Sequence, residues 1–210
     1  MFFVAKRKKK KEESWLSTII WCVVIVLLVI GLRTFVFSPM KISGHSMDPT
    51  LADGERVISW KLSKVKRFDI VTLKAPDDPS KDYVKRVIGL PGDTIQMKND
   101  ELYINGKHYD EPYLNTFKKA MKNGSLASHY PNEYKEVAEN TKLFTENFTL
   151  QTLASTKGTI KVPNDTYFVM GDNRIISKDS RMLGFIPEKN ILGVVKFIYW
   201  PIKDFGPVKN

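Results

Sequence analysis

Hydrophobic residues occur along this 210-residue chain in two different patterns. Near the N-terminus, residues 15–32 form one apolar run without a charged side chain, and apolar residues return at 35–37 after Arg33. This run approaches the length at which an α-helix crosses a hydrocarbon layer of about 30 Å. Beyond it, apolar residues occur in short segments separated by turn residues. The pattern predicts a transmembrane helix over residues 15–36, followed by a mainly β region.

Short β-branched segments mark the predicted strands of that region. The segments are residues 56–60, 69–73, 83–88, 94–97, 101–104, 166–170 and 191–199. A turn cluster at residues 89–93 ends one of them, and the Asn105-Gly106 pair between two runs is a strong signal for a β-hairpin. Because sustained helical periodicity is absent after the first helix, we predict a mainly β fold class.

Residues 111–161 differ from the rest of the chain, because Lys, Asn, Glu, Ser and Thr dominate and apolar residues are sparse. We interpret this region as a lobe inserted into the β core, with a short helix near residues 132–139. Asn147 and Asn164 each begin a glycosylation sequon, but so short a pattern is weak evidence. The role of the lobe is left open.

The charge distribution orients the predicted helix. The net charge is +10, and residues 6–11 are six consecutive basic residues just before the apolar run. The positive-inside rule therefore places residues 1–14 in the cytoplasm and residues 37–210, the predicted catalytic domain, outside the cell membrane. A cleaved secretory signal would end in small residues, whereas this run ends in bulky and charged ones. Nucleic-acid binding is disfavoured, because no basic motif interleaved with aromatic residues follows.

Cysteine and histidine offer little chemistry in this sequence. Cys22 is the single cysteine, so no intramolecular disulfide can form, and we expect it to face lipid or fill a packing gap. The three histidines, His45, His108 and His129, lack the spacing of metal ligands. We therefore expect no metal site.

The stretch Ser-Gly-His-Ser-Met-Asp-Pro-Thr-Leu, residues 43–51, places a serine beside a histidine. His45 is a poor candidate base for Ser46, because side chains of adjacent residues in an extended chain point to opposite faces. Asp48 is also too local to orient it as the acid of a triad. We expect His45 to be a loop residue, while Gly44 leaves room for backbone N–H groups to approach a developing oxyanion.

Lys85 is unusual because it lies inside an apolar predicted strand. Alternation places it on one face with Tyr83 and Val87, and places Arg86 on the other face. Burial would disfavour the charged amine and lower its pKa. A neutral lysine can accept a proton from a serine hydroxyl, so Lys85 is a candidate general base.

A third stretch, residues 170–181, reads Met-Gly-Asp-Asn-Arg-Ile-Ile-Ser-Lys-Asp-Ser-Arg. It suggests ion pairs of Asp172 with Arg174 and of Asp179 with Arg181. A solvated loop with weak surface pairs is the ordinary interpretation of such a pattern. The functional interpretation is a buried support for a site, in which Ser177 hydrogen-bonds a lysine amine.

Together, these three stretches resemble the type I signal peptidases, which are membrane-anchored Ser-Lys proteases. The resemblance rests on residues 44–51, 85–93 and 171–181, in this order behind an apolar anchor, and it covers the chain except for residues 111–161. It implies a signal-peptidase-like β core without metal or diffusible cofactor. It also implies that Ser46 is the nucleophile, Lys85 the base and Ser177 the residue that orients Lys85, with Asp172, Arg174, Asp179 and Arg181 forming structural ion pairs.

The same resemblance implies the substrate and the partners. The substrate would be a secreted preprotein, cut after a small-x-small sequence at the outer face of the cytoplasmic membrane. Membrane lipid would be a neighbour, and the secretion translocon is a further candidate partner. Substrate-binding residues would be Ile42, Gly44, Met47, Leu51 and Val84. Gly44 stands where some members carry a serine, so the chain looks like the Gram-positive type, with backbone N–H groups, notably that of Ser46, binding the oxyanion.

Two other interpretations fit the sequence less well. A self-cleaving Ser-Lys repressor would need a DNA-binding N-terminal domain and a cleavable Ala-Gly dipeptide, and this sequence has an apolar run instead and no such dipeptide. A membrane-tethered binding module or decayed homologue would not need Ser46, Lys85 and Ser177, which are all present.

Overall fold

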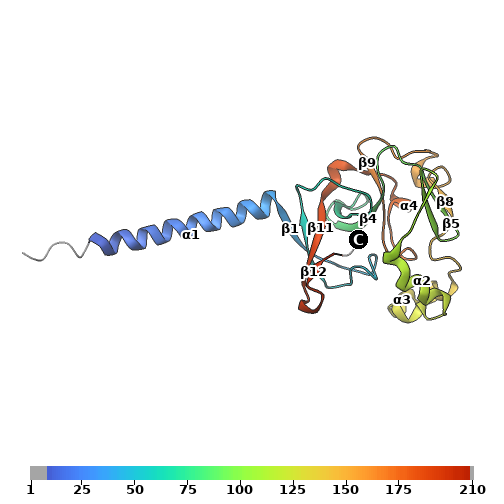
Figure 1. Ribbon diagram of the computed structural model, residues 1–210, viewed down its shortest axis with the longest axis horizontal. Helices are drawn as coiled ribbons and strands as arrows, with labels where there is room; N and C mark the ends of the chain where they lie inside the picture. Colours follow the sequence, from blue (N-terminus) through green and yellow to red (C-terminus); the bar gives the residue numbers. More distant parts are fainter. Residues whose placement is uncertain (1–8, 209–210) are drawn as a thin grey trace, which may run out of the picture.

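The computed structural model describes residues 9–208, so the first eight residues of the predicted basic tail lie outside the described residues. One long helix, α1 (Lys9–Phe35), projects away from a β-rich body (Figure 1). Its Trp15–Phe35 segment is long and apolar enough to cross a membrane, and its side chains are exposed. The anchor predicted over residues 15–36 coincides with this segment to within one residue.

The helix leads directly into the body. Strand β1 (Phe37–Lys41) begins two residues after α1 ends and pairs antiparallel with β2 (Arg56–Trp60). Lys61 strengthens this junction, because its backbone N–H donates to the carbonyl of Val36 and its Nζ donates to the carbonyl of Thr34, both at 2.8 Å. The last turn of the helix is therefore hydrogen-bonded to the residue that follows β2.

The larger sheet runs in the order β1-β2-β11-β3-β4-β9-β10, with β12 added beside β11, and all its pairings are antiparallel. Its remaining strands are β3 (Ile70–Lys74), β4 (Asp82–Gly89), β9 (Thr166–Met170), β10 (Ile186–Pro187), β11 (Ile191–Trp200) and β12 (Gly206–Pro207). Strand β4 lies between β3 and β9 and is buried on both faces from Val84 onward. Every side chain from Val84 onward therefore has a packed environment.

A smaller sheet, in the order β7-β6-β5-β8, lies on the other side of the body. Its strands are β5 (Ile95–Lys98), β6 (Glu101–Ile104), β7 (Lys107–Tyr109) and β8 (Phe148–Thr149). The Asn105-Gly106 turn joins β6 to β7, as the hairpin signal predicted, and both residues have a positive φ. Apolar residues of β4 and β9 pack with those of β5, β6 and β8 in one core cluster, which joins the two sheets.

The region predicted as an inserted lobe has its own small core. It contains α2 (Asn115–Lys122), α3 (Asn132–Asn140) and the 3₁₀ segments Pro112–Leu114, Leu126–His129 and Ala154–Thr156. The predicted helix near residues 132–139 is confirmed as α3, whereas α2 was not predicted. Although apolar residues are few along this part of the sequence, α2, α3 and the loops around them bring several of them together in one buried cluster. Its members are Leu114, Phe117, Ala120, Leu126, Tyr130, Ala138 and Phe144.

The remaining helical segments are short. They are α4 (Ser180–Leu183) and the 3₁₀ turns Glu188–Asn190 and Ile202–Asp204. The predicted strands agree with the structure to within about two residues at each end, and the predicted mainly β class is confirmed. Strand β1 was not predicted, because Pro39 and Lys41 interrupt its apolar pattern.

Candidate active site

Ser46 lies in a tight loop between β1 and β2. Gly44 has φ of +88°, a left-handed conformation that glycine adopts without steric cost, and its N–H donates to Asp53 Oδ1 at 2.8 Å. On the other side of Ser46, the N–H groups of Thr50 and Leu51 both donate to the carbonyl of Met47. These bonds hold the loop on both sides of the serine.

Lys85 on β4 points to this loop. Its Nζ donates to Ser46 Oγ at 2.8 Å, and its side chain is only 4% exposed. Burial disfavours the charged amine and lowers the pKa of Lys85 from 10.5 to about 8, against the opposing influence of the carboxylates of Asp179 and Asp172. The side chain therefore reaches the serine, and about a tenth of it is neutral at pH 7, far more than for an ordinary lysine.

His45 takes no part in this contact. Its Nδ1 lies 3.0 Å from Asp48 Oδ2, and the His45 side chain is 30% exposed. Among the described residues, its ring makes no hydrogen bond to Ser46. Burial raises the pKa of the Asp48 carboxyl, although the neighbouring His45 acts to lower it.

One backbone donor beside the serine is available for an oxyanion. The N–H of Ser46 makes no hydrogen bond to any residue between 9 and 208, while the N–H of Gly44 is occupied by Asp53. An N–H that points to a reacting carbonyl can stabilise the negative charge that develops there. The donor expected from sequence is therefore unoccupied.

A groove of about 260 Å³ lies over Ser46 and Lys85. Of the predicted substrate-binding residues, Ile42, Gly44, Met47 and Val84 line it. Leu51 does not: it is fully buried and packs in the core cluster beneath the loop, because the turn at Met47 folds it inward. Leu51 stays a predicted substrate-binding residue, which the structure places in the same core cluster as Ile42, Met47 and Val84.

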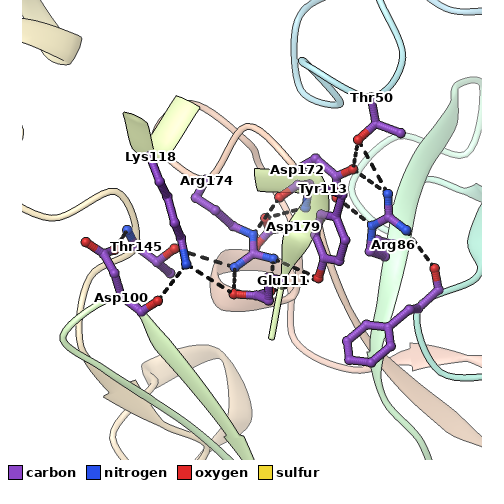
Figure 2. Close-up of polar contacts among 12 residues, drawn as sticks. Thr50, Arg86, Asp100, Glu111, Tyr113, Lys118, Thr145, Asp172, Arg174 and Asp179 are labelled. Atoms are coloured by element: carbon purple, nitrogen blue, oxygen red, sulfur yellow. Dashed lines mark hydrogen bonds and ion pairs between the residues drawn. The ribbon is translucent and has the colours of Figure 1, made fainter. Parts of the chain in front are cut away.

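The third stretch makes different ion pairs from those expected. Asp172 pairs with Arg86 rather than with Arg174, through bonds of 2.8 Å from Nε and 2.6 Å from Nη2. Arg174 forms a buried pair with Glu111 of the lobe (Figure 2). Burial drives these pairings, since each fully buried guanidinium requires a carboxylate in contact.

Asp179 pairs with Arg181, as the spacing suggested, with Nη2 of Arg181 at 2.8 Å from Oδ2. The same carboxylate accepts the N–H of Gly171 at 2.9 Å and the N–H of Arg181 at the start of α4. These donors and the guanidinium lower the pKa of the buried Asp179 carboxyl, although burial alone would raise it. Asp179 thus connects α4 to the chain that follows β9.

The hydrogen bond expected between Ser177 and Lys85 is not formed in this structure. Ser177 Oγ is buried and has no hydrogen-bond partner among the described residues. It occupies the space that glycine leaves at position 171, since a Cβ built on Gly171 would lie 2.1 Å from Ser177 Oγ and 2.5 Å from the carbonyl oxygen of Ser46. Because Gly171 has no side chain, the segment after β9, the turn that carries Ser177 and the nucleophile loop can pack against one another.

Further residues around the site were not predicted from sequence. Tyr113 stacks on Arg86, with the guanidinium carbon 3.8 Å from the ring centre, and Thr50 donates to Asp172 at 2.5 Å (Figure 2). The sequence holds two weak signals for them: Arg86 is a charge within an apolar strand segment, and Glu111 and Tyr113 flank Pro112 at the start of the lobe.

Taken together, the fold and this geometry define a class of enzyme. A serine hydroxyl contacts a buried lysine amine of lowered pKa, a free backbone N–H lies beside it, and a groove runs over both. This is the arrangement of a serine hydrolase that uses lysine as its base.

Comparisons with known proteins agree with this class. The family described as "Signal peptidase, peptidase S26" matches residues 15–200. The chain is 42% identical over 183 residues to signal peptidase I of Streptococcus pneumoniae, covering 83% of this chain and 87% of the relative. It is 44% identical to signal peptidase I of Bacillus caldolyticus, covering 87% and 90%. Signal peptidase IB of Staphylococcus aureus is 41% identical, with 86% of each chain covered.

A solved structure is also similar. The crystal structure of a signal peptidase I from Enterococcus faecalis matches with a TM-score of 0.51 and 36% identity, covering 63% of this chain and 97% of that one. The chain belongs to the signal peptidase family, peptidase S26, and is a serine endopeptidase. The resemblance noted in the sequence is confirmed.

Proposed function

We propose that this protein removes signal peptides from preproteins as a signal peptidase I, with Ser46 as nucleophile and Lys85 as general base. The observation that carries the assignment is the 2.8 Å contact between Lys85 Nζ and Ser46 Oγ, made by a lysine that burial keeps partly neutral. The names of the S. pneumoniae and B. caldolyticus relatives, both called signal peptidase I, support the substrate class.

The proposed reaction begins with neutral Lys85. Lys85 Nζ accepts the hydroxyl proton of Ser46 as Oγ forms a bond to the carbonyl carbon of the scissile peptide. The carbonyl oxygen takes up the electron pair, and the N–H of Ser46 donates to the resulting oxyanion. The C–N bond then breaks, and the Lys85 ammonium gives its proton to the leaving amine. In the second half, Lys85 deprotonates a water that hydrolyses the ester, and Ser46 regains its proton.

The groove supports the proposed preference for small residues beside the cut. Ile42, Met47 and Val84 provide apolar walls, and the groove of about 260 Å³ is also lined by the catalytic pair and by Tyr83, Tyr134 and Ile176. Walls that are already packed into the core leave shallow subsites, which suit side chains the size of alanine. Ser177 remains the proposed orienting residue, because its buried hydroxyl has no hydrogen-bond partner among the described residues.

We further propose that the body lies against the outer face of the membrane. The basic residues before the apolar helix favour an N-terminus in the cytoplasm. Large apolar side chains are exposed on the body near the helix junction and at the end of β11, and these exposed side chains support lipid as a neighbour. They are Trp60, Leu62, Trp200, Ile202 and Phe205. The secretion translocon is a candidate partner because it delivers the substrate to the same face.

Cleavage of a preprotein by purified full-length enzyme in detergent, with the products mapped by mass spectrometry, tests the assignment. Ser46→Ala and Lys85→Ala should each abolish cleavage after a small-x-small sequence. Ser128→Ala and Lys74→Ala are matched controls, because both residues are exposed and neither lines the groove. Cleavage by either site variant at near the wild-type rate would refute the assigned roles.

The proposed topology has a separate test. A cysteine introduced at the exposed Ser128, in a Cys22→Ala background, should react with a membrane-impermeant maleimide added to intact cells whose wall has been removed. Labelling only after the cells are opened would place the body in the cytoplasm and contradict the proposal.

A further inference from the structure

The lobe reaches the nucleophile loop through one buried asparagine. Tyr130 lies in the lobe core, where its side chain is 4% exposed and its ring packs 5.7 Å from that of Phe117. Its hydroxyl donates to Asn173 Oδ1 at 2.6 Å. Asn173 is fully buried and follows Asp172 in the chain. The lobe therefore makes a polar contact directly behind the site.

Asn173 uses both its side chain and its backbone. Its Nδ2 donates to the carbonyl of His45 at 2.9 Å, and its N–H donates to the carbonyl of Ser46 at 3.1 Å. Its own carbonyl accepts the N–H of Ser177 at 3.0 Å. One residue thus holds two consecutive carbonyls of the nucleophile loop and the turn that carries Ser177.

The donor and acceptor roles in these hydrogen bonds require Tyr130 to act as a donor. The carbonyl of His45 can only accept, so the Asn173 amide must turn its NH₂ toward His45 and its oxygen toward Tyr130. Burial raises the pKa of Tyr130, so its phenol stays protonated and donates across the working pH range. Without this hydroxyl, Asn173 Oδ1 would be a buried acceptor with no partner, and the amide would move to find one.

We propose that Tyr130 is a positioning residue for catalysis. Through Asn173 it fixes the backbone at residues 45–46, and this backbone sets both the approach of Ser46 Oγ to Lys85 and the direction of the free Ser46 N–H. The lobe is then part of the support of the active site. This inference rests on the proposed function of Ser46 as the nucleophile.

The test is Tyr130→Phe, which removes only the hydroxyl. Loss of one buried hydrogen bond should lower kcat about tenfold, while KM changes less than about twofold. The inflection of the pH–rate profile should stay where it is, because the groups that surround Lys85 are unchanged. Asn173→Ala should lower kcat at least as much, and the double variant should be no slower than Asn173→Ala alone.

Two controls separate positioning from loss of stability. Phe144→Leu loosens the same lobe core without a polar link to Asn173, and it should lower the melting temperature without lowering kcat. Tyr103→Phe removes an exposed tyrosine–Glu101 hydrogen bond and should leave both quantities unchanged. If Asn173→Ala does not fold, Asn173→Asp replaces it, because the carboxylate still accepts from Tyr130 but cannot donate to His45.

The outcomes are distinct. A wild-type kcat for Tyr130→Phe, additive losses in the double variant, or an equal loss of kcat in Phe144→Leu would each overturn the role of Tyr130. Ser46→Ala is measured in the same assay. If it remains active, the assignment of the nucleophile fails; if it is inactive while Tyr130→Phe is fully active, only this further inference fails.

Discussion

Arg86 and Asp172 form an ion pair from which water is excluded, with two hydrogen bonds of 2.8 and 2.6 Å and no exposed side-chain surface on either partner. Lys85, the preceding residue of β4, is also buried, but its amine forms no ion pair with any described carboxylate and instead hydrogen-bonds to Ser46. Two adjacent cations in one strand therefore have different environments. One has a counter-ion in contact, and the other is driven toward its neutral form.

Breaking the buried pair should destabilise the fold. Asp172→Asn leaves the Arg86 guanidinium without a counter-ion in a site that water does not reach. We expect the free energy of unfolding to fall by about 3–5 kcal/mol, measured by chemical denaturation in detergent. Asp82→Asn is the control, because its pair with Lys74 is partly exposed, and we expect it to change stability by less than about 1 kcal/mol. Equal effects of the two variants would contradict this account.

The pH dependence of cleavage should report Lys85. Only the neutral amine accepts the Ser46 proton, so kcat/KM should rise about tenfold per pH unit at low pH and level off above about pH 8. Arg181→Met should move the inflection to higher pH, because it removes a nearby positive charge and leaves Asp179 uncompensated. Lys74→Met should leave it in place. A flat profile between pH 6 and 9 would argue against Lys85 as the base.

Replacing the base should make the protein more stable. The folded pKa of Lys85 is about 8 and its ordinary value is 10.5, so the unfolded chain binds more protons between these two pH values. The free energy of unfolding therefore rises with pH across this window. Below the window, burial of the charged lysine destabilises the fold by its full amount, about 3 kcal/mol. Lys85→Met should abolish cleavage yet unfold later than wild type at pH 7, with the difference shrinking toward pH 10. A constant difference across this range would show that burial does not shift the lysine.

Ser177→Ala tests the proposed orienting hydroxyl. Because Ser177 Oγ has no hydrogen-bond partner within residues 9–208, its removal should leave the free energy of unfolding unchanged or slightly raised. If the hydroxyl hydrogen-bonds Lys85 during the reaction, kcat should nevertheless fall about 10- to 100-fold. Ser128→Ala in an exposed turn of the lobe serves as the control. Loss of stability together with a normal kcat would assign Ser177 a packing role alone.

Local pattern was sufficient to predict much of the fold. Strands β2 and β9 have the predicted bounds because their β-branched residues alternate or run together between clear turn residues. The anchor and the hairpin at Asn105-Gly106 also follow from local chemistry. Helix α2 was not predicted: Phe117, Ala120 and Met121 have helical spacing, but the helix is only eight residues long and lies in a segment dominated by Lys, Asn and Thr.

The pairing of distant residues could not be predicted in the same way. Asp172 meets Arg86 because the register of β4 and β9 places Arg86 opposite Met170, two residues before Asp172. The sequence does not state which strands are neighbours, so the nearer Arg174 was the expected partner. Likewise, Glu111 and Tyr130 reach the site only through the folding of the lobe, and the sequence places neither beside Arg174 or Asn173.

The junction between α1 and β1 has a mechanical consequence. Val36 alone separates the last residue of the helix from the first residue of the strand, and Lys61 ties this junction to β2. A flexible linker would let the body pivot independently of the helix, whereas this connection is too short to do so. In the proposed membrane-spanning arrangement, any tilt of the helix is thus transmitted to the sheet and changes the height of Ser46 above the lipid.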